Sequence, residues 1–214
     1  MSVRIVLESE GRYAAATAVD WPGWARHLRG DEEDALEALV AYAPRYAVVP
    51  ERAGVSFSPD LDALDVVERL PGRHNSMGPG ARSEAESAPL SGGEGARLAA
   101  LLAGCWDVLD DVLATAPAQL RKGPRGGGRD REAVRGHVEG AQGGYALRVG
   151  LRRPASLGPV VVRQRLLAVL RGEERPEPPE RNPWPLRYLA NKSAWHVTDH
   201  AFEVQDRSAS GEAV

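Results

Sequence analysis

Apolar and charged residues alternate at the start of the chain in the pattern of a half-buried β-strand. Val3, Ile5 and Leu7 occupy every second position, which places them on one face of a strand. A second run suited to a strand follows at 13–19, after a turn signal at 10–11. The two runs together predict a β-hairpin.

The next pattern has the period of a helix. Asp31 is a suitable N-cap residue, and acidic residues follow at 32–34, where the helix dipole favours negative charge. Pro44 is expected to end or kink this helix, and 63–70 is expected to supply a further strand. Residues 1–72 therefore predict a small β-β-α-β domain. The apolar stripe of its helix consists of Leu36, Leu39, Val40 and Ala43.

The pattern changes at residues 73–93, which are rich in Gly, Ser, Pro and Ala and show no periodicity, as expected of a linker. Four amphipathic stripes follow within 94–207, and they predict a four-helix bundle. The connection Ala116–Asp130 between its first two helices is longer than bundle connections usually are. The predicted fold class is α+β, with a short tail at 208–214.

Composition and charge limit the classes of protein. The chain has 214 residues, of which 43% are hydrophobic and 27% charged, and its formal net charge is −3. This charge gives no reason to expect nucleic acid as the main partner. No apolar run of about 18 residues predicts a membrane span, and the charged first residues predict no signal peptide. One cysteine, Cys105, suits a reducing cytoplasm.

Candidate chemistry centres on histidine. His196 and His200 are four positions apart on the last stripe, so both rings can reach one point on a helix face. His137 lies on the apolar stripe of the second predicted helix. The three residues are either hydrogen-bonded core histidines or ligands of a divalent metal ion, and their convergence from two helices favours the metal. The other two, His27 and His74, are expected on the surface.

Neighbouring residues narrow the metal chemistry. A zinc protease of the HExxH type has glutamate directly after the first histidine, and Val197 holds that position here. Three imidazoles without an obvious fourth protein ligand are typical of an open catalytic site, in which the ion lowers the pKa of a bound group. Imidazole suits Zn, Ni and Fe as well as Cu, and we take Zn, Ni or Fe as the candidates.

Glu203 is the acidic residue best placed to act with this site. It follows His200 by three positions and His196 by seven, so it lies on the same helix face. Its candidate roles are an orienting partner of a ligand, a catalytic proton-transfer group or a fourth ligand. The alternative is a solvated glutamate near the helix end.

A basic, glycine-rich loop directly precedes the second predicted helix. Arg121, Lys122, Arg125 and Arg129 surround three consecutive glycines at 126–128. Glycines let backbone N–H groups approach a ligand, and a helix N-terminus favours anions. The loop is therefore a candidate binding site for a carboxylate or phosphate of the substrate, or else a flexible solvated connection. It matches neither of the common nucleotide-binding motifs.

The stretches 135–138 (RGHV) and 194–200 (AWHVTDH), within a predicted four-helix bundle, resemble the DinB/YfiT-like superfamily over about 93–207. The resemblance implies a metal-dependent enzyme whose ligands are the three histidines named above. Some members of that superfamily use mycothiol or bacillithiol in isomerase or S-transferase reactions, so mycothiol is implied as a candidate second cofactor.

The N-terminal unit resembles a HicB-type antitoxin fold. The matching residues are Trp21-Pro22-Gly23-Trp24 and the acidic helix start at 31–36. This resemblance implies an accessory module that binds a partner or forms a homodimer.

Two functions remain open from the sequence. The first is a cytoplasmic metal-dependent enzyme that activates water or a thiol for transfer to, or hydrolysis of, a small molecule. The second is a non-catalytic binding or regulatory protein, whose HicB-like unit mediates association and whose metal is structural or absent. In a third case the bundle is free of metal and contains three hydrogen-bonded histidines.

Overall fold

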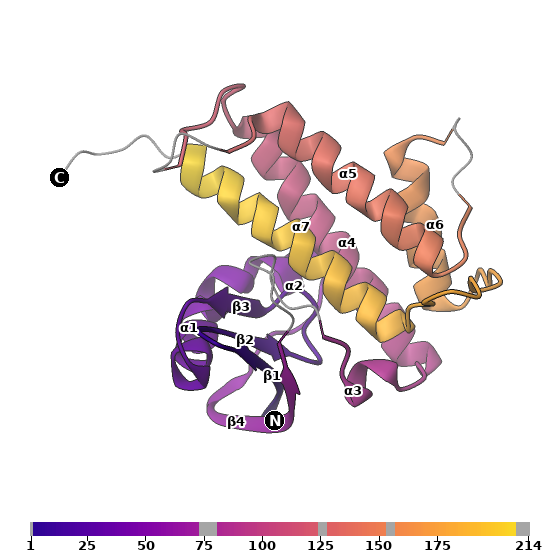
Figure 1. Ribbon diagram of the computed structural model, residues 1–214. Coiled ribbons are helices and arrows are strands. Elements are labelled where there is room, and N and C mark those ends of the chain that lie inside the picture. The colour runs from indigo at the N-terminus through magenta and orange to yellow at the C-terminus, as the bar shows by residue number, and fades with distance from the viewer. Residues whose placement is uncertain (1, 73–80, 124–127, 153–156, 209–214) are drawn as a thin grey trace.

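The computed structural model describes residues 2–72, 81–123, 128–152 and 157–208. The protein combines a four-stranded sheet with helices, and Figure 1 shows the sheet and α1 on one side and the long helices on the other. In chain order the elements are β1 (Ser2–Glu10), β2 (Tyr13–Ala18), β3 (Ala25–Leu28), α1 (Glu32–Tyr46), α2 (Val48–Arg52), β4 (Asp60–Pro71), α3 (Glu84–Ser87), α4 (Gly92–Thr115), α5 (Arg131–Arg148), α6 (Pro159–Arg171) and α7 (Leu186–Ser208).

The sheet has the strand order β3-β2-β1-β4. The predicted hairpin is confirmed, since β1 and β2 are antiparallel and Glu10 pairs with Tyr13 across the turn. Gly11 in this turn has a φ of +60°, a conformation that glycine adopts at little cost. The predicted strand at 63–70 is also confirmed as β4, which lies parallel to β1. The short strand β3, antiparallel to β2, was not predicted.

Helix α1 begins as its sequence predicts but ends later. Asp31 accepts a hydrogen bond from the Asp34 backbone N–H, and the Asp34 side chain accepts one from the Asp31 N–H, which forms a capping box. Pro44 was expected to end or kink this helix. It does not end it, because α1 continues to Tyr46. Tyr46 is fully buried and donates to the Pro22 carbonyl oxygen at 2.9 Å, so packing stabilises the last turn.

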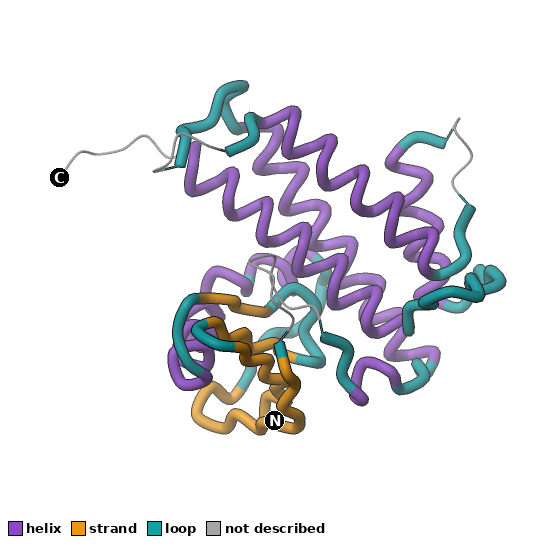
Figure 2. The backbone as a smooth tube through the Cα atoms, viewed as in Figure 1, coloured by secondary structure: helices purple, strands orange, loops and turns teal. Residues whose placement is uncertain are grey.

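The four long helical stripes correspond to α4, α5, α6 and α7. Helix α4 packs against α7 and α6, and α5 packs against the same two helices, as the tube in Figure 2 shows. The predicted α+β class is confirmed at this level. Part of the expected linker is structured, because the short helix α3 and a capping box at Ser91 precede α4. Residues 73–80 of that segment lie outside the described residues.

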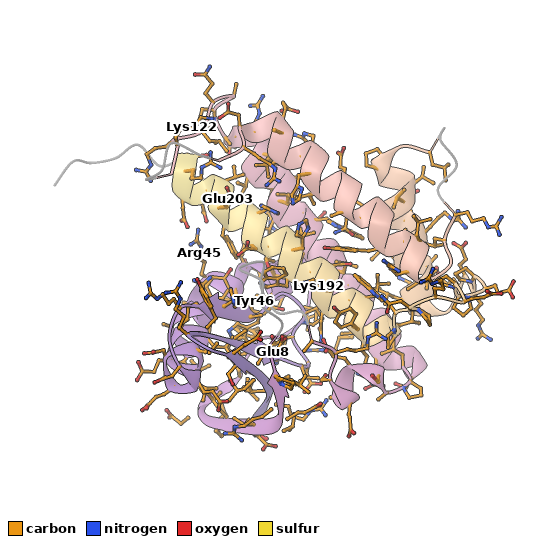
Figure 3. All side chains as sticks on the ribbon, in the orientation of Figure 1. Glu8, Arg45, Tyr46, Lys122, Lys192 and Glu203 are labelled. Carbon is orange, nitrogen blue, oxygen red and sulfur yellow. The ribbon has the colours of Figure 1, made fainter. Side chains whose placement is uncertain are left out.

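Helix α7 also covers one face of the sheet. Helix α1 packs on the face of the sheet that carries Ile5 and Leu7, and the opposite face, with Val6, meets the N-terminal half of α7. Figure 3 shows Glu8 and Lys192 on these facing elements. The buried apolar residues of the sheet unit and of the helices form one continuous core. Within the described ranges, no helix is long and apolar enough to cross a membrane.

Candidate metal centre

The three histidines singled out from the sequence lie together in the structure. One ring nitrogen from each of His137, His196 and His200 lies within 4.8 Å of the other two. The Nε2 atoms of His137 and His196 are 3.1 Å apart. Two imidazole nitrogens about 2.1 Å from one tetrahedral ion stand roughly 3.4 Å apart. The spacing of this pair is therefore close to that of two ligands on one metal ion.

Two helices position these rings. His196 and His200 lie on the buried stripe of α7, and each is about 9% exposed. His137 lies on α5, one position before the fully buried Val138, and is itself half-buried. Helices α5 and α7 pack against each other, so the stripes that bury their apolar residues also bring the histidines together. The side of the cluster formed by His137 is its more open side.

Burial keeps two of the rings neutral. Burial first, and then the charges of the neighbouring His200 and His137, together lower the pKa of His196 to about 3. Burial also lowers the pKa of His137, with smaller contributions from Arg129 and His200. Neutral imidazoles keep a lone pair on one ring nitrogen, which is the state that a metal ion requires. The rings are thus prepared for a cation rather than carrying charge themselves.

Glu203 contacts one of the candidate ligands directly. Its Oε2 lies 2.8 Å from Nδ1 of His200, and its Oε1 lies 2.6 Å from Nη1 of Arg207. The hydrogen bond from His200 lowers the pKa of Glu203, burial opposes this shift, and Arg207 adds to it. Because a carboxylate accepts hydrogen bonds, Nδ1 of His200 is the donor in this contact, and the neutral ring with this tautomer has its lone pair on Nε2. This arrangement suits the role of an orienting partner.

The basic residues of the loop differ in whether other groups of the protein already bind their side chains. Arg121 donates to the Asp206 carbonyl oxygen at 2.8 Å, and Lys122 donates to Asp130 Oδ1 at 2.7 Å, so both are engaged by the protein itself. Arg129 is exposed, has no hydrogen-bond or ion-pair partner in the described part of the chain, and lowers the pKa of the nearest histidines by its charge. Arg125 lies outside the described residues. Arg129 is therefore the best available anchor for an anionic ligand.

Aromatic residues that the sequence did not assign to the site border it. The rings of Tyr145 and His196 meet edge to face with centroids 5.9 Å apart, and Trp184 lies 5.0 Å from Tyr145. Burial raises the pKa of Tyr145 to about 12, so its hydroxyl is a neutral donor. The spacing of eight residues between His137 and Tyr145 places both on one helix face, which is the signal that could have indicated it.

Some buried polar atoms of α5 and α7 have no hydrogen-bond partner among the described residues. Nδ1 of His196, Oγ of Ser193 and both amide atoms of Gln142 are buried without a hydrogen-bond partner among the described residues. Ser193 lies one turn before His196 on α7, and Gln142 lies on α5 between His137 and Tyr145. Buried polar groups of this kind usually bind ordered water or ligand. Helices α5 and α7 therefore bury polar atoms that the described residues do not satisfy.

Comparisons of the chain with protein-family models, with curated proteins and with solved structures gave no significant match in any of the three. The site must consequently be judged on its own geometry.

Proposed function

We propose that this protein is a metal-dependent enzyme of the DinB-like superfamily, in which His137, His196 and His200 hold a divalent cation. The observation that carries the proposal is the approach of three ring nitrogens, from two helices, to within 4.8 Å of one another. Buried histidines that each bonded to a separate partner would not converge in this way. Zn, Ni and Fe all accept imidazole ligands.

The proposed reaction is either the transfer of a thiol to a small molecule or the hydrolysis of that small molecule. A cation held by three imidazoles lowers the pKa of a bound water or thiol and so supplies the nucleophile. Glu203 keeps the proton on Nδ1 of His200. Arg129 attracts an anionic substrate toward the open side of the site, next to His137. Mycothiol remains the candidate thiol, on the resemblance alone, and the reducing cytoplasm is the proposed compartment.

The alternative is a non-catalytic binding or regulatory protein with a HicB-like unit, which associates with a partner or with a second copy of the chain. One observation favours it: a distance of 3.1 Å between Nε2 of His137 and Nε2 of His196 is also that of an ordinary hydrogen bond. A cluster held in this way needs no metal.

Metal content distinguishes the two. We would measure metals by mass spectrometry in the wild-type protein and in His137→Ala and His200→Ala, with His27→Ala as the control. His27 stacks on Tyr13, outside the cluster. The enzyme proposal predicts about one equivalent of metal in the wild type and in His27→Ala, and its loss from the two site variants while they stay folded. A folded wild type that takes up no Zn²⁺, Ni²⁺ or Fe²⁺ would exclude the enzyme.

A further inference from the structure

A continuous series of contacts joins the candidate metal ligand His200 to the loop that precedes α5. His200 Nδ1 meets Glu203 Oε2 at 2.8 Å, Glu203 Oε1 meets Arg207 Nη1 at 2.6 Å, and Arg207 Nε donates to the Arg121 carbonyl oxygen at 2.8 Å. We call these four residues the His200–Arg121 relay. Figure 3 shows Glu203 on α7 and Lys122, the neighbour of Arg121, at the C-terminal end of that helix.

The loop is fixed to α7 at its start by further bonds. The Arg121 backbone N–H donates to the Arg207 carbonyl oxygen at 3.1 Å, and the Arg121 guanidinium donates to the Asp206 carbonyl oxygen at 2.8 Å. These bonds also satisfy two of the carbonyl groups that a helix C-terminus leaves without partners. Main chain and side chain therefore hold Arg121 and Arg207 in one arrangement.

The far end of the loop lies against the same guanidinium. A Cβ atom added to Gly128 would lie 2.7 Å from Nη2 and 2.8 Å from Cζ of Arg207. Gly128 has a φ of +117°, so glycine is favoured there for its backbone as well as for its size. The guanidinium is enclosed by both ends of the loop, and its side chain is only 12% exposed.

This enclosure determines what Glu203 can do. Its two carboxylate oxygens are divided between Arg207 and His200, and the side chain is 34% exposed. Without Arg207, the partly exposed Glu203 side chain could adopt several rotamers, and water would compete with His200 for its carboxylate oxygens. With Arg207 in place, one oxygen is held toward His200, which selects the imidazole tautomer whose Nε2 is free to bind a metal.

We propose that Arg207 is a positioning residue for the metal site, and that Arg121 and Gly128, by packing on Arg207, fix the tautomer and orientation of His200. This inference rests on the proposed function for the presence of a metal, but the tautomer can be measured without one. Arg207 was not assigned a role from the sequence, and Gly128 was considered only as part of a loop that could bind an anion. The spacing of four residues between Glu203 and Arg207 is the usual signal of an ion pair on a helix.

A simpler role must be separated from this one, because Arg207 could act only by securing the end of α7. Arg45 offers a matched control. It binds the same helical turn from α1, through Asp206 at 2.6 Å and the Phe202 carbonyl oxygen at 3.2 Å, and Figure 3 labels it beside that turn. Arg45 is not part of the relay. Loss of Arg45 should therefore loosen the helix end but leave His200 unchanged.

The first experiment is long-range ¹H–¹⁵N NMR of the histidine rings in the metal-free, full-length protein. We expect His200 to be protonated at Nδ1 in the wild type and in Arg45→Gln, and to exchange between tautomers in Arg207→Gln. Arg207→Lys keeps the charge but loses the fork that reaches both Glu203 and Arg121, so it should be intermediate. An unchanged His200 signal in a folded Arg207→Gln would overturn the proposal.

The second experiment measures Zn²⁺ affinity by competition with a chromophoric chelator. Loss of a direct partner of a ligand, here Glu203, typically weakens binding about 10- to 100-fold. Arg207→Gln acts through Glu203, so we expect it to weaken binding by up to that factor, and Arg45→Gln to leave the affinity unchanged. Equal weakening by both variants would reduce Arg207 to a structural role. If the wild type binds no metal, the proposed function fails, and the NMR result alone decides the relay.

Gly128→Ala tests the contact between the loop and Arg207 without substituting any residue of the relay. The added methyl group should displace Arg207 and reproduce the tautomer exchange of Arg207→Gln. The control is Gly11→Ala, which also places alanine at a positive φ but has no atom within 4 Å of the new Cβ. A wild-type His200 signal in Gly128→Ala would show that the loop does not act on the site.

Discussion

Cys105 lies on α4 and packs against the turn at Gly23. A Cβ atom added to Gly23 would lie 3.4 Å from Sγ of Cys105. Its side chain is fully buried, and burial raises the pKa of its thiol well above the ordinary value. A thiol of this kind is a small apolar group rather than a nucleophile.

We therefore expect Cys105 to be inert in the native protein. A chromogenic disulfide reagent should label less than about a tenth of the chain under native conditions and the whole population in denaturant, because reaction requires opening of the core. Rapid stoichiometric labelling of the folded protein would contradict this description of α4 and its neighbours.

At the residue scale the sequence identified the three histidines that the structure brings together, but not the residues that position them. His137, His196 and His200 could be found because each lies on an apolar stripe with helical spacing. The role of Arg207 could not be found, since it depends on a carbonyl oxygen at Arg121, 86 positions away. Among the described basic residues of the loop, only Arg129 has no hydrogen-bond or ion-pair partner in the described chain, and its charge lowers the pKa of His137. That distinction depends on hydrogen bonds such as that of Lys122 with Asp130, which periodicity does not report.

Among the elements, α4 is crossed closely by α2 at a glycine. A Cβ atom at Gly104 would lie 2.7 Å from the Val49 carbonyl oxygen and 3.2 Å from the Ala53 nitrogen. Both neighbours are backbone atoms, so neither can move aside by a change of rotamer. The close contact between the two elements therefore depends on glycine at this position.

Gly104→Ala should accordingly destabilise the protein by about 1–3 kcal/mol, the usual cost of overpacking. Gly144→Ala is the matched control, because its new Cβ meets no atom within 4 Å, and alanine in an exposed helix is favoured over glycine by about 0.5–1 kcal/mol. Chemical denaturation measures both. A neutral Gly104→Ala would show that α2 can shift away from α4.

The start of α4 carries the element's main pH dependence. A hydrogen bond from Arg187 of α7, followed by those from the Ser91 backbone and hydroxyl, lowers the pKa of Glu94 to about 2 from an ordinary value of 4.5. A carboxylate with a lowered pKa in the folded state stabilises that state above its unfolded pKa. The contribution is lost as the pH falls from about 4.5 toward 2.

We expect Glu94→Gln to be less stable than the wild type at pH 7 and to show a flatter decline of the unfolding free energy between pH 4.5 and 2. Arg187→Gln should flatten the same window, because Arg187 is the largest cause of the shift. Urea titrations at several pH values measure the slope. A slope equal to that of the wild type in both variants would contradict the assignment.

Long elements were predictable and short ones were not. The stripes that predicted α4, α5, α6 and α7 extend over several turns, so their periodicity is clear. Strand β3 has four residues and helix α2 has five, too few to show a period. The extension of α1 past Pro44 depends on Tyr46, whose hydroxyl bonds to Pro22, a tertiary contact that overrides a local breaker.

In the whole molecule, the packing of the sheet unit on the helices was the largest feature that sequence patterns did not supply. The composition of 73–93 suggested separate units joined by a linker. The structure places Ile5, Trp24 and Tyr46 in one buried cluster with Cys105 and Val197. Periodicity shows which face of an element is buried but not which element covers it, so a shared core could not be inferred.

A shared core predicts one cooperative unfolding transition. Tryptophans lie in both parts of the molecule, Trp21 and Trp24 near the sheet and Trp106 and Trp195 on the helices. Tryptophan fluorescence and far-ultraviolet circular dichroism should therefore report the same midpoint in denaturant. A fragment of residues 81–214 should lack a sharp thermal transition. Two resolved transitions would instead indicate units that fold independently.

The turn of α7 between His196 and His200 has few positions free to vary. Thr198 lies between the two histidines, and its hydroxyl is 3.3 Å from the Gly23 carbonyl oxygen. Val197, beside it, is fully buried in the common core. An insertion or deletion of one residue here would rotate the candidate ligands and the contact with the Gly23 turn together. Among related chains, changes in this pentapeptide should therefore be rarer than changes at exposed positions of the same helix.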